Sequence, residues 1–309
     1  MAGRRRGLGA QLLPTSSPRC ATGCLAMFPT EQYELLDFGH GRKLERFADV
    51  LLDRPAPAAT GIATGGPALW NRADARFSRS AGADGRWTDR GHPPPRWTVR
   101  HGAVVLELNR TGSGAIGVYP EQAENWDWIE RQLRGAQHRL KVLNLFAYTG
   151  GSTLTAAAAG AEVVHVDASR SAVAWARRSA ALSGLATAPI RWIVEDSRTF
   201  AEREIRRGNQ YDAIILDPPS YGHGPQTEAW KIDQHLYGLL RACGQLTSSR
   251  RAFILLTCHS PDIGPTDLAA MLADTIFGHS HADVRAKRLV LQTRDGRRLD
   301  SGVAARWPS

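Results

Sequence analysis

The chain has 309 residues, a formal charge of +9 at pH 7, and a composition of 42% hydrophobic and 22% charged residues. This length allows two domains, or one large domain with an appendage, and a substantial buried core. No apolar run approaches the roughly 20 residues of a membrane-spanning helix, so no membrane association is predicted. Cys20, Cys24, Cys243 and Cys258 form no CxxC pair or zinc-ligand set, which argues against a metal and for a reducing cytoplasm.

The positive charge lies mainly at the two ends of the chain. Residues 1–30 carry four arginines and no acid, and residues 284–309 carry seven basic and two acidic groups. Residues 121–283 hold 16 basic and 18 acidic groups, so the central part is nearly neutral. This distribution fits a polyanionic partner such as a nucleic acid, and it fits an arginine-rich proteome equally well.

Residues 1–30 contain Gly, Pro, Ser and Arg without sustained hydrophobic periodicity, which predicts a disordered basic tail. An organellar transit peptide has a similar composition, and Met27 is an alternative start. A secretory signal is not expected, because this stretch lacks the apolar core that such signals need.

Residues 31–120 predict an N-terminal β-rich module. Gly39-His40-Gly41 separates two strand-like halves, which end at residues 53–57. Turns at His101-Gly102 and at residues 111–114 separate later strands. Several aromatic side chains either fill the small core of this module or stack on bases: Trp70, Phe77, Trp87 and Trp97.

Three strand-then-loop units organise the rest of the chain, namely VLNLF (142–146), VVHVD (163–167) and AIILD (213–217). They are short, apolar and rich in β-branched residues, as is typical of strands buried on both faces of a parallel sheet. Helical patterns lie between them, which indicates right-handed βαβ units. We therefore predict an α/β fold with a doubly wound, mostly parallel sheet over residues 121–309.

Local patterns place the remaining elements of this domain. Helices are expected at about residues 121–134, 152–159, 171–183 and 232–246, through Phe200 and Ile205, and from a cap at Thr266-Asp267 to Phe277. Ser169 or Ser171 is expected to cap the helix at 171–183. Strands are expected at 190–195 and 252–257, and an antiparallel pair at 287–292 and 302–306 closes the sheet around Asp295-Gly296.

Ligands of such sheets bind outside the carboxyl ends of the strands. The loop Thr149-Gly150-Gly151 follows the first strand and points a helix N-terminus at an anionic group. It is neither GxGxxG nor a Walker loop, so a carboxylate without phosphate fits it better. Asp167 ends the second strand, where an acid either accepts both ribose hydroxyls or is a solvated carboxylate or a helix cap. Asp196, after the third strand, either accepts from an adenine amino group or caps the next helix.

Asp217-Pro218-Pro219-Ser220 is the most specific stretch of the sequence. Its two prolines fix the backbone and remove two donors, which leaves carbonyl groups to face a planar substrate. Such a corner holds a base or an amine beside a reactive group, while Asp217 accepts its proton or a hydrogen bond.

Together, VLNLFAYTGG, HVDAS, the Glu195-Asp196 pair and DPPSYG resemble the class I S-adenosylmethionine-dependent methyltransferases. Within that class they look most like the group of bacterial 23S ribosomal RNA cytosine-C5 methyltransferases, which have a segment similar to Val118–Gln122. The resemblance covers about residues 115–260. It implies a Rossmann-like sheet of seven strands, the last antiparallel, and S-adenosylmethionine as the cofactor.

The resemblance also implies the site and the substrate. Asp217, Pro218 and Pro219 are expected to position a base of RNA, in particular ribosomal RNA. The residues expected to bind the cofactor are Asn144, Tyr148, Thr149, Gly150, Gly151, Asp167, Ala168, Asp196, Ser197 and Asp217.

Methylation of cytosine C5 requires a thiolate that attacks C6, and Cys258 after the fifth strand is the candidate. The cysteine of the group lies about two residues later, so Cys258 is either this nucleophile or a half-buried thiol at a strand end. Ser220 stands where amine methyltransferases have an aromatic residue, and Tyr221 follows it as in the cytosine-C5 group.

Three hypotheses therefore remain open. The chain methylates RNA at cytosine C5, it methylates a nitrogen or a small-molecule or protein substrate, or it is an RNA-binding scaffold without catalysis. The basic hairpin with Arg294, Arg297 and Arg298 either contacts phosphates or forms a solvated face. Trp230 and Lys231 either belong to a lid or serve in packing and at the surface.

Overall fold

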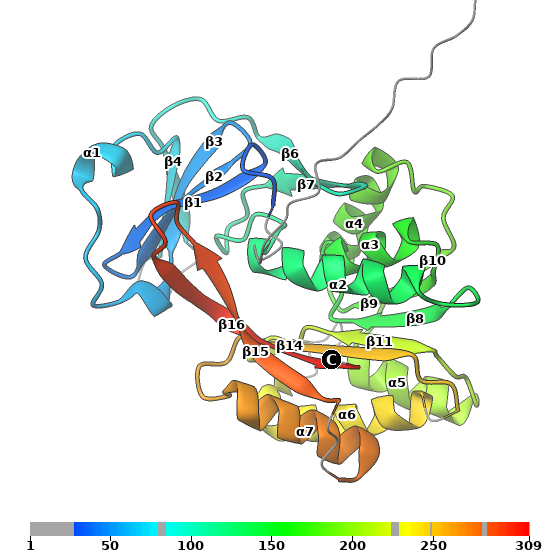
Figure 1. Ribbon diagram of the computed structural model, residues 1–309. Coiled ribbons are helices and arrows are strands. Elements are labelled where there is room, and N and C mark those ends of the chain that lie inside the picture. The colour runs from blue at the N-terminus through cyan, green and yellow to red at the C-terminus, as the bar shows by residue number, and fades with distance from the viewer. Residues whose placement is uncertain (1–27, 80–84, 224–228, 248, 280–282, 309) are drawn as a thin grey trace, which may run out of the picture.

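The computed structural model describes residues 28–79, 85–223, 229–247, 249–279 and 283–308. Its largest sheet has seven strands in the order β10-β9-β8-β11-β14-β16-β15. The first five strands in this order, β10, β9, β8, β11 and β14, run parallel to one another. Strand β16 runs antiparallel to both of its neighbours, β14 and β15. This arrangement confirms the predicted doubly wound, mostly parallel sheet (Figure 1). Its strands are β8 (Lys141–Leu145), β9 (Glu162–Asp167), β10 (Ile190–Val194), β11 (Ala213–Leu216), β14 (Phe253–Cys258), β15 (Arg285–Gln292) and β16 (Arg298–Trp307).

Helices cover both faces of this sheet (Figure 1). Successive strand residues point to opposite faces, so Ala213 and Ile215 of β11 join one core cluster, whereas Ile214 and Leu216 join the other. The first cluster includes residues of α2, α3 and α4, and the second includes residues of α5, α6 and α7. The helices are α2 (Ala123–Arg134), α3 (Gly151–Ala158), α4 (Arg170–Leu182), α5 (Ser197–Arg206), α6 (Ile232–Leu246) and α7 (Pro265–Phe277).

The predicted helix caps were right at one helix and wrong at another. Ser169 caps α4, because its Oγ accepts a hydrogen bond from the backbone N–H of Ala172 at 3.2 Å. The cap of α7 is Gly264 rather than Thr266 or Asp267. Pro265 suits the first helical position, since its fixed φ is already helical and its missing N–H is not needed there. The Asp267 carboxylate accepts from the Gly264 N–H at 2.9 Å.

The N-terminal module contains a five-stranded sheet in the order β1-β2-β3-β4-β5. The segment predicted as two strand-like halves forms three strands, which corrects that prediction. The missed turn is Ala48-Asp49, where Ala48 adopts a φ of +52° although glycine is the usual residue at positive φ. The strands are β1 (Tyr33–Gly39), β2 (Arg42–Phe47), β3 (Val50–Pro55), β4 (Ala75–Ser78) and β5 (Arg86–Asp89), with a short helix α1 (Pro67–Trp70) between β3 and β4.

Two segments assigned to the N-terminal regions pack against the helices of the large sheet. The hairpin of β6 (Arg96–His101) and β7 (Val104–Asn109) contacts α4, where the Trp175 indole donates to the Glu107 carbonyl at 2.8 Å. Phe28, assigned to the disordered tail, is buried and packs edge-on against Trp126. Residues 1–27 of that tail lie outside the described residues, and the domain boundary near residue 120 stays a prediction.

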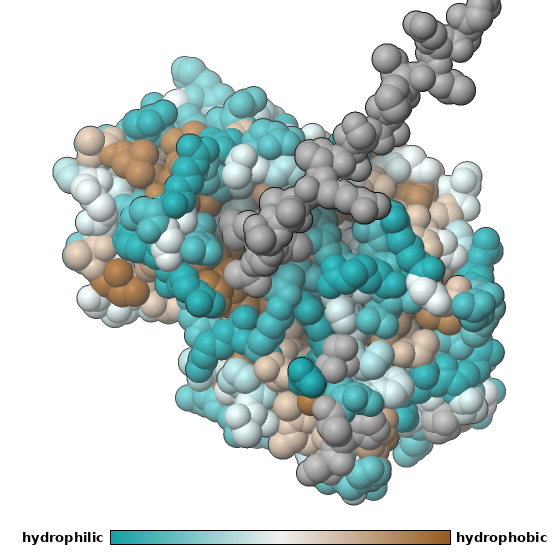
Figure 2. All heavy atoms as spheres, viewed as in Figure 1, coloured by the Kyte–Doolittle hydropathy of each residue, from teal (hydrophilic) through white to brown (hydrophobic). Residues whose placement is uncertain are grey.

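The β15–β16 hairpin extends from the large sheet to the N-terminal sheet (Figure 1). Arg297 forms an ion pair with the buried Asp37 of β1, and Arg294 forms one with Glu34. These two arginines therefore join the sheets, although the Arg294 side chain stays largely solvated, as one of the two predictions for this hairpin had it. Among the described residues, no helix is long and apolar enough to cross a membrane. Figure 2 shows that this face is largely hydrophilic, with hydrophobic side chains gathered over the N-terminal sheet and at the junction of the two parts.

Candidate functional site

A cavity of about 520 Å³ lies at the carboxyl ends of the central strands. The order of the sheet reverses between β8 and β11, and such a reversal opens the crevice in which doubly wound folds bind ligands. A volume of this size is typical of a small-molecule site. The wall includes residues that follow five different strands: Phe146, Tyr148, Asp167, Ala168, Ser169, Asp196, Ser197, Asp217, Pro218, Pro219, Ser220, Trp230 and His259.

The loop after β8 has a strained backbone. Phe146 and Tyr148 have φ values of +55° and +50°, which are rare for bulky side chains and occur mainly where function requires them. Gly150 adopts a φ of +91° and forms the N-cap of α3. At Gly151, an added Cβ would lie 2.4 Å from the Trp126 ring. Close packing of α2 against α3 therefore explains the second glycine, rather than the close approach of a ligand.

Besides Tyr148 and Asp217, which line both cavities, four of the predicted cofactor residues line a smaller, adjoining cavity of about 40 Å³. Thr149 is buried and donates from its hydroxyl to the Gly117 carbonyl at 2.6 Å, so it fixes the segment before α2 to the loop. Asn144 is also buried and donates to the Thr153 hydroxyl at 2.9 Å. The four residues are Asn144, Thr149, Gly150 and Gly151.

Asp167 lies at the end of β9 in the wall of the larger cavity. Its two carboxylate oxygens accept hydrogen bonds from the backbone N–H groups of Tyr148 at 2.7 Å and Ser169 at 2.8 Å. Burial raises the pKa of Asp167, and these two hydrogen bonds offset the effect only in part. Each oxygen keeps a further lone pair, so the group can accept two hydrogen bonds from a ligand.

Asp196 caps the N-terminus of α5, which is one of the two roles predicted for it. Its Oδ1 accepts from the N–H groups of Arg198 and Thr199, both at 3.0 Å. The residue is 4% exposed but still contributes to the wall of the cavity beside Ser197. Capping and ligand contact are thus compatible here, because the second carboxylate oxygen takes no part in the cap.

Asp217 follows β11 and accepts from three side chains. Its carboxylate accepts from the Thr257 hydroxyl, from Gln122 Nε2 at 3.1 Å, and pairs with His259 Nε2 at 3.3 Å. Burial alone would raise the pKa of Asp217, but the charge of His259 and these hydrogen bonds outweigh it and hold the pKa below its usual value. A carboxylate stabilised in this way is a weak base and a fixed hydrogen-bond acceptor.

His259 is the functional residue that the sequence reasoning missed. Burial lowers its pKa, yet the carboxylate of Asp217 outweighs this and raises the pKa to about 9. Its Nδ1 lies 2.9 Å from the Ser301 carbonyl, so the protonated ring donates from both nitrogens. Tyr119 lies beside it, with ring centroids 6.2 Å apart, and also borders Tyr148 at 5.7 Å.

The two prolines after Asp217 form part of the cavity wall, as predicted. The Pro219 carbonyl accepts from the Trp230 indole at 2.6 Å, and Trp230 packs on Phe146 with ring centroids 4.8 Å apart. Trp230 is 2% exposed, so it supports the corner by packing.

Cys258 does not reach the cavity. Alternation along a strand places Thr257 and His259 on the face toward Asp217 and Cys258 on the other face. There Cys258 is fully buried in the core beneath α6 and α7. Burial also raises the pKa of this thiol, which opposes thiolate formation. This position disfavours Cys258 as the nucleophile, and its catalytic role stays a prediction.

The signals for the missed residues were present but unassigned. Tyr119 and Gln122 belong to the segment Val118–Gln122 that carried part of the resemblance, although no role followed from it. His259 is one position from Cys258, and strand alternation alone distinguishes them. Within the described residues, no group of three or more His, Cys, Asp or Glu side chains is arranged to hold a metal ion.

The cavity fits the cofactor predicted from the resemblance. A partly buried carboxylate with free lone pairs suits a ribose diol, and Asp167 provides it beside Ala168 and Ser169. No arginine or lysine lines this cavity within the described residues, as expected for a ligand without phosphate. The individual cofactor contacts stay predictions.

A family model described as S-adenosylmethionine-dependent methyltransferase matches residues 72–279, which is more than half of the chain. The solved structure of an S-adenosylmethionine-dependent methyltransferase from Agrobacterium tumefaciens is 36% identical to this chain. The two superpose with a TM-score of 0.83 over 90% of each chain.

Two curated relatives match shorter parts of the chain. Ribosomal RNA large subunit methyltransferase K/L of Pseudoalteromonas atlantica is 40% identical over 37% of this chain and 16% of its own length. Ribosomal RNA large subunit methyltransferase I of Aeromonas hydrophila is 33% identical over 39% of this chain and 30% of its own length. The chain thus matches less than a third of the length of either relative.

Proposed function

Because this chain belongs to the S-adenosylmethionine-dependent methyltransferases, we propose that it methylates a base of ribosomal RNA. The observation that supports this most directly is the cavity at the switch point of the sheet, which Asp167 and Asp217 both line. The names of the two curated relatives support ribosomal RNA as the substrate. Such a substrate agrees with the cytoplasmic location, which stays a prediction.

We assign the cofactor to the side of Asp167. Asp167 accepts from the ribose hydroxyls, Asp196 and Ser197 border the adenine, and the loop at Thr149–Gly151 receives the amino-acid end. S-adenosylmethionine, when bound, supplies an electrophilic methyl group on its sulfonium. The strained loop holds Tyr148 against Asp167 at 2.7 Å, so the two parts of this subsite are fixed to each other before binding.

We assign the acceptor base to the side of Asp217, Pro218 and Pro219. The lowered pKa of Asp217 keeps it ionised, so it accepts a hydrogen bond from an amino or imino group of the base. This contact orients the nitrogen lone pair toward the methyl group. As the new N–C bond forms and the S–C bond breaks, the nitrogen releases its proton to water, because Asp217 is a weak base.

A nitrogen is the acceptor that the described residues support, rather than cytosine C5. Methylation of C5 needs a thiolate beside the base, and Cys243 and Cys258 are both buried. Cys20 and Cys24 lie outside the described residues. The acceptor predicted from the resemblance would therefore require Cys258 to leave the core, whereas Asp217 suits a nitrogen without rearrangement.

The test is methyl transfer from radiolabelled S-adenosylmethionine to ribosomal RNA from cells that lack this protein. We expect label in the large-subunit RNA and, after nuclease digestion, a base methylated at nitrogen by mass spectrometry. Label in 5-methylcytidine would overturn the nitrogen assignment. An absence of label in any ribosomal RNA, with S-adenosylmethionine bound, would overturn the RNA substrate.

A further inference from the structure

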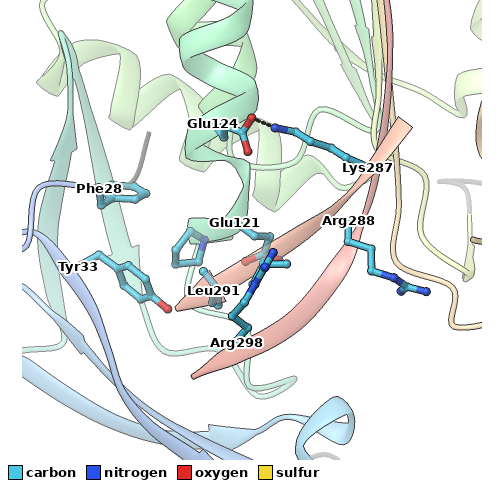
Figure 3. A pocket seen from close by; sticks show the side chains of 10 residues that line it. Phe28, Tyr33, Glu121, Glu124, Lys287, Arg288, Leu291 and Arg298 are labelled. Atoms are coloured by element: carbon cyan, nitrogen blue, oxygen red, sulfur yellow. Dashed lines mark hydrogen bonds and ion pairs between the residues drawn. The ribbon is translucent and has the colours of Figure 1, made fainter. Parts of the chain in front are cut away.

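A second cavity, of about 210 Å³, lies between β1, the C-terminal hairpin and the turn that precedes α2 (Figure 3). This turn, η2 (Pro120–Gln122), forms one wall, and Phe28, Tyr33 and Leu291 contribute apolar surface. The cavity is distinct from the cofactor cavity, because none of the residues that line the one lines the other.

A carboxylate oxygen in this cavity has no partner. Glu121 Oε2 is buried and accepts no hydrogen bond from any described residue. Leaving a buried acceptor unsatisfied is costly, and for an ionised group the cost is larger. A donor group that reaches this oxygen would recover the lost hydrogen bond, so the cavity is a candidate site for a ligand with donor groups.

A free cation shares the cavity with this carboxylate. Lys287 pairs with Glu124, and Arg288 pairs with Asp300. The Arg298 side chain also lines the cavity but, in contrast, has no ion pair or side-chain hydrogen bond with the described part of the chain. Figure 3 shows Arg298 extending from β16 toward Glu121, whereas Arg288 points away.

The ligand that satisfies both groups offers donors on one side and acceptors on another. Guanine presents N1–H and N2–H₂ on one edge, which match the two oxygens of a carboxylate, and O6 and N7 on another, which match a guanidinium. Apolar walls suit the faces of a planar base, since single-stranded RNA is read through splayed and stacked bases. We propose that this cavity binds a guanine base of the RNA substrate, adjacent to the methylated nucleotide, which rests on the proposed function.

The proposed guanine site is connected to the cofactor cavity through one turn of chain. Tyr119 precedes Glu121 by two residues and lines the cofactor cavity, and Gln122 follows it and donates to Asp217 at 3.1 Å. A base held by Glu121 therefore fixes the backbone that positions Asp217. The site would make the enzyme select RNA in which a guanine lies next to the methylated nucleotide. The guanine occupies this site while the neighbouring base enters the cavity at Asp217.

The test compares guanosine and inosine monophosphates, which differ only by the 2-amino group. Binding is measured by calorimetry on the full chain with saturating S-adenosylhomocysteine, which occupies the Asp167 side of the cofactor cavity, and the variants at Glu121 and Arg298 distinguish the proposed site from the Asp217 side. We expect guanosine monophosphate to bind at about millimolar concentration and inosine monophosphate about fivefold more weakly. Glu121→Gln should weaken the binding of guanosine monophosphate about tenfold and abolish the preference for guanosine over inosine monophosphate.

Matched variants distinguish binding in this cavity from a general attraction of the nucleotide to the positively charged hairpin. Arg298→Ala should weaken guanosine monophosphate, whereas Arg285→Ala removes an exposed cation of the same hairpin outside the cavity and should leave binding unchanged. Equal binding of both nucleotides, or no effect of Glu121→Gln, would overturn the proposed site. Wild-type protein that methylates ribosomal RNA but binds no guanosine monophosphate would overturn it too, while the proposed function would stand.

Discussion

Two carboxylates line the same cavity and differ in charge behaviour. Asp167 at the end of β9 accepts from two backbone N–H groups, and burial raises its pKa. Asp217 after β11 accepts from Thr257 and Gln122 and pairs with His259, and its pKa is lowered. Burial raises the pKa of both groups, so the difference comes from the cationic partner that only Asp217 has.

This difference assigns distinct tasks to the two ends of the cavity. A carboxylate without a charged partner binds a neutral diol without competition from a cation, as a ribose requires. A carboxylate held between an imidazolium and two neutral donors keeps a fixed orientation, which favours positioning a substrate. As the pH falls, Asp167 should therefore become neutral before Asp217 does.

The largest expected effect is at Asp217. Asp217→Asn removes the charge that pairs with His259 and the acceptor for the base, so kcat should fall by about 10²- to 10³-fold. The Kd for S-adenosylhomocysteine should change much less, because the ribose contacts lie at Asp167. Single-turnover methylation and calorimetry measure the two quantities. A variant that retains its wild-type kcat would contradict the positioning role of Asp217.

Asp167→Asn should have the opposite effect: the Kd for S-adenosylhomocysteine should change more than kcat. Loss of two charge-assisted hydrogen bonds should weaken the binding of S-adenosylhomocysteine by about 10- to 100-fold, while kcat at saturating cofactor stays close to the wild-type value. Glu162→Gln, at the exposed start of the same strand, is the control and should leave affinity unchanged. An unaltered Kd for Asp167→Asn would exclude this residue from the cofactor site.

The strands of the large sheet were predictable because burial on both faces leaves a continuous apolar signature. The segments at 142–146, 163–167 and 213–217 are indeed neighbours in the sheet, and their polar ends meet at the cavity. Strand order and the position of the cavity follow from general rules of doubly wound folds. The acids at the strand ends were therefore accessible to sequence reasoning.

Pairings between distant residues were not predictable. The ion pair of Asp37 and Arg297 joins residues 260 positions apart, and no local pattern connects them. The two-residue turn at Ala48 was missed because its positive φ occurs without glycine. The roles of Cys258 and His259 were confused because chemistry favoured the thiol, whereas strand alternation decides which side chain faces Asp217.

The pairing of His259 with Asp217 predicts a pH-dependent stability. The pKa of His259 is raised to about 9 from an unfolded value of about 6.5. The pair therefore stabilises the fold fully below about pH 6.5, and this contribution is lost as the pH rises through about 9. Comparison of Tm for wild type and His259→Gln should show a gap of several degrees at pH 6 that narrows by pH 10. A gap that is constant over this range would contradict the ion pair.

The smallest expected effect on methyl transfer is at Cys258, where the structure and the sequence disagree. Cys258→Ala removes a buried sulfur from the core and should cost about 1 kcal/mol of unfolding free energy, as a small cavity forms. Cys243→Ala is a matched control, because Cys243 is equally buried in the same cluster of α6, α7 and β14. Both variants should show the same loss of stability in urea and unchanged methylation of ribosomal RNA. A selective loss of methylation in Cys258→Ala would restore the thiolate mechanism, and it would mean that Cys258 leaves the core when RNA binds.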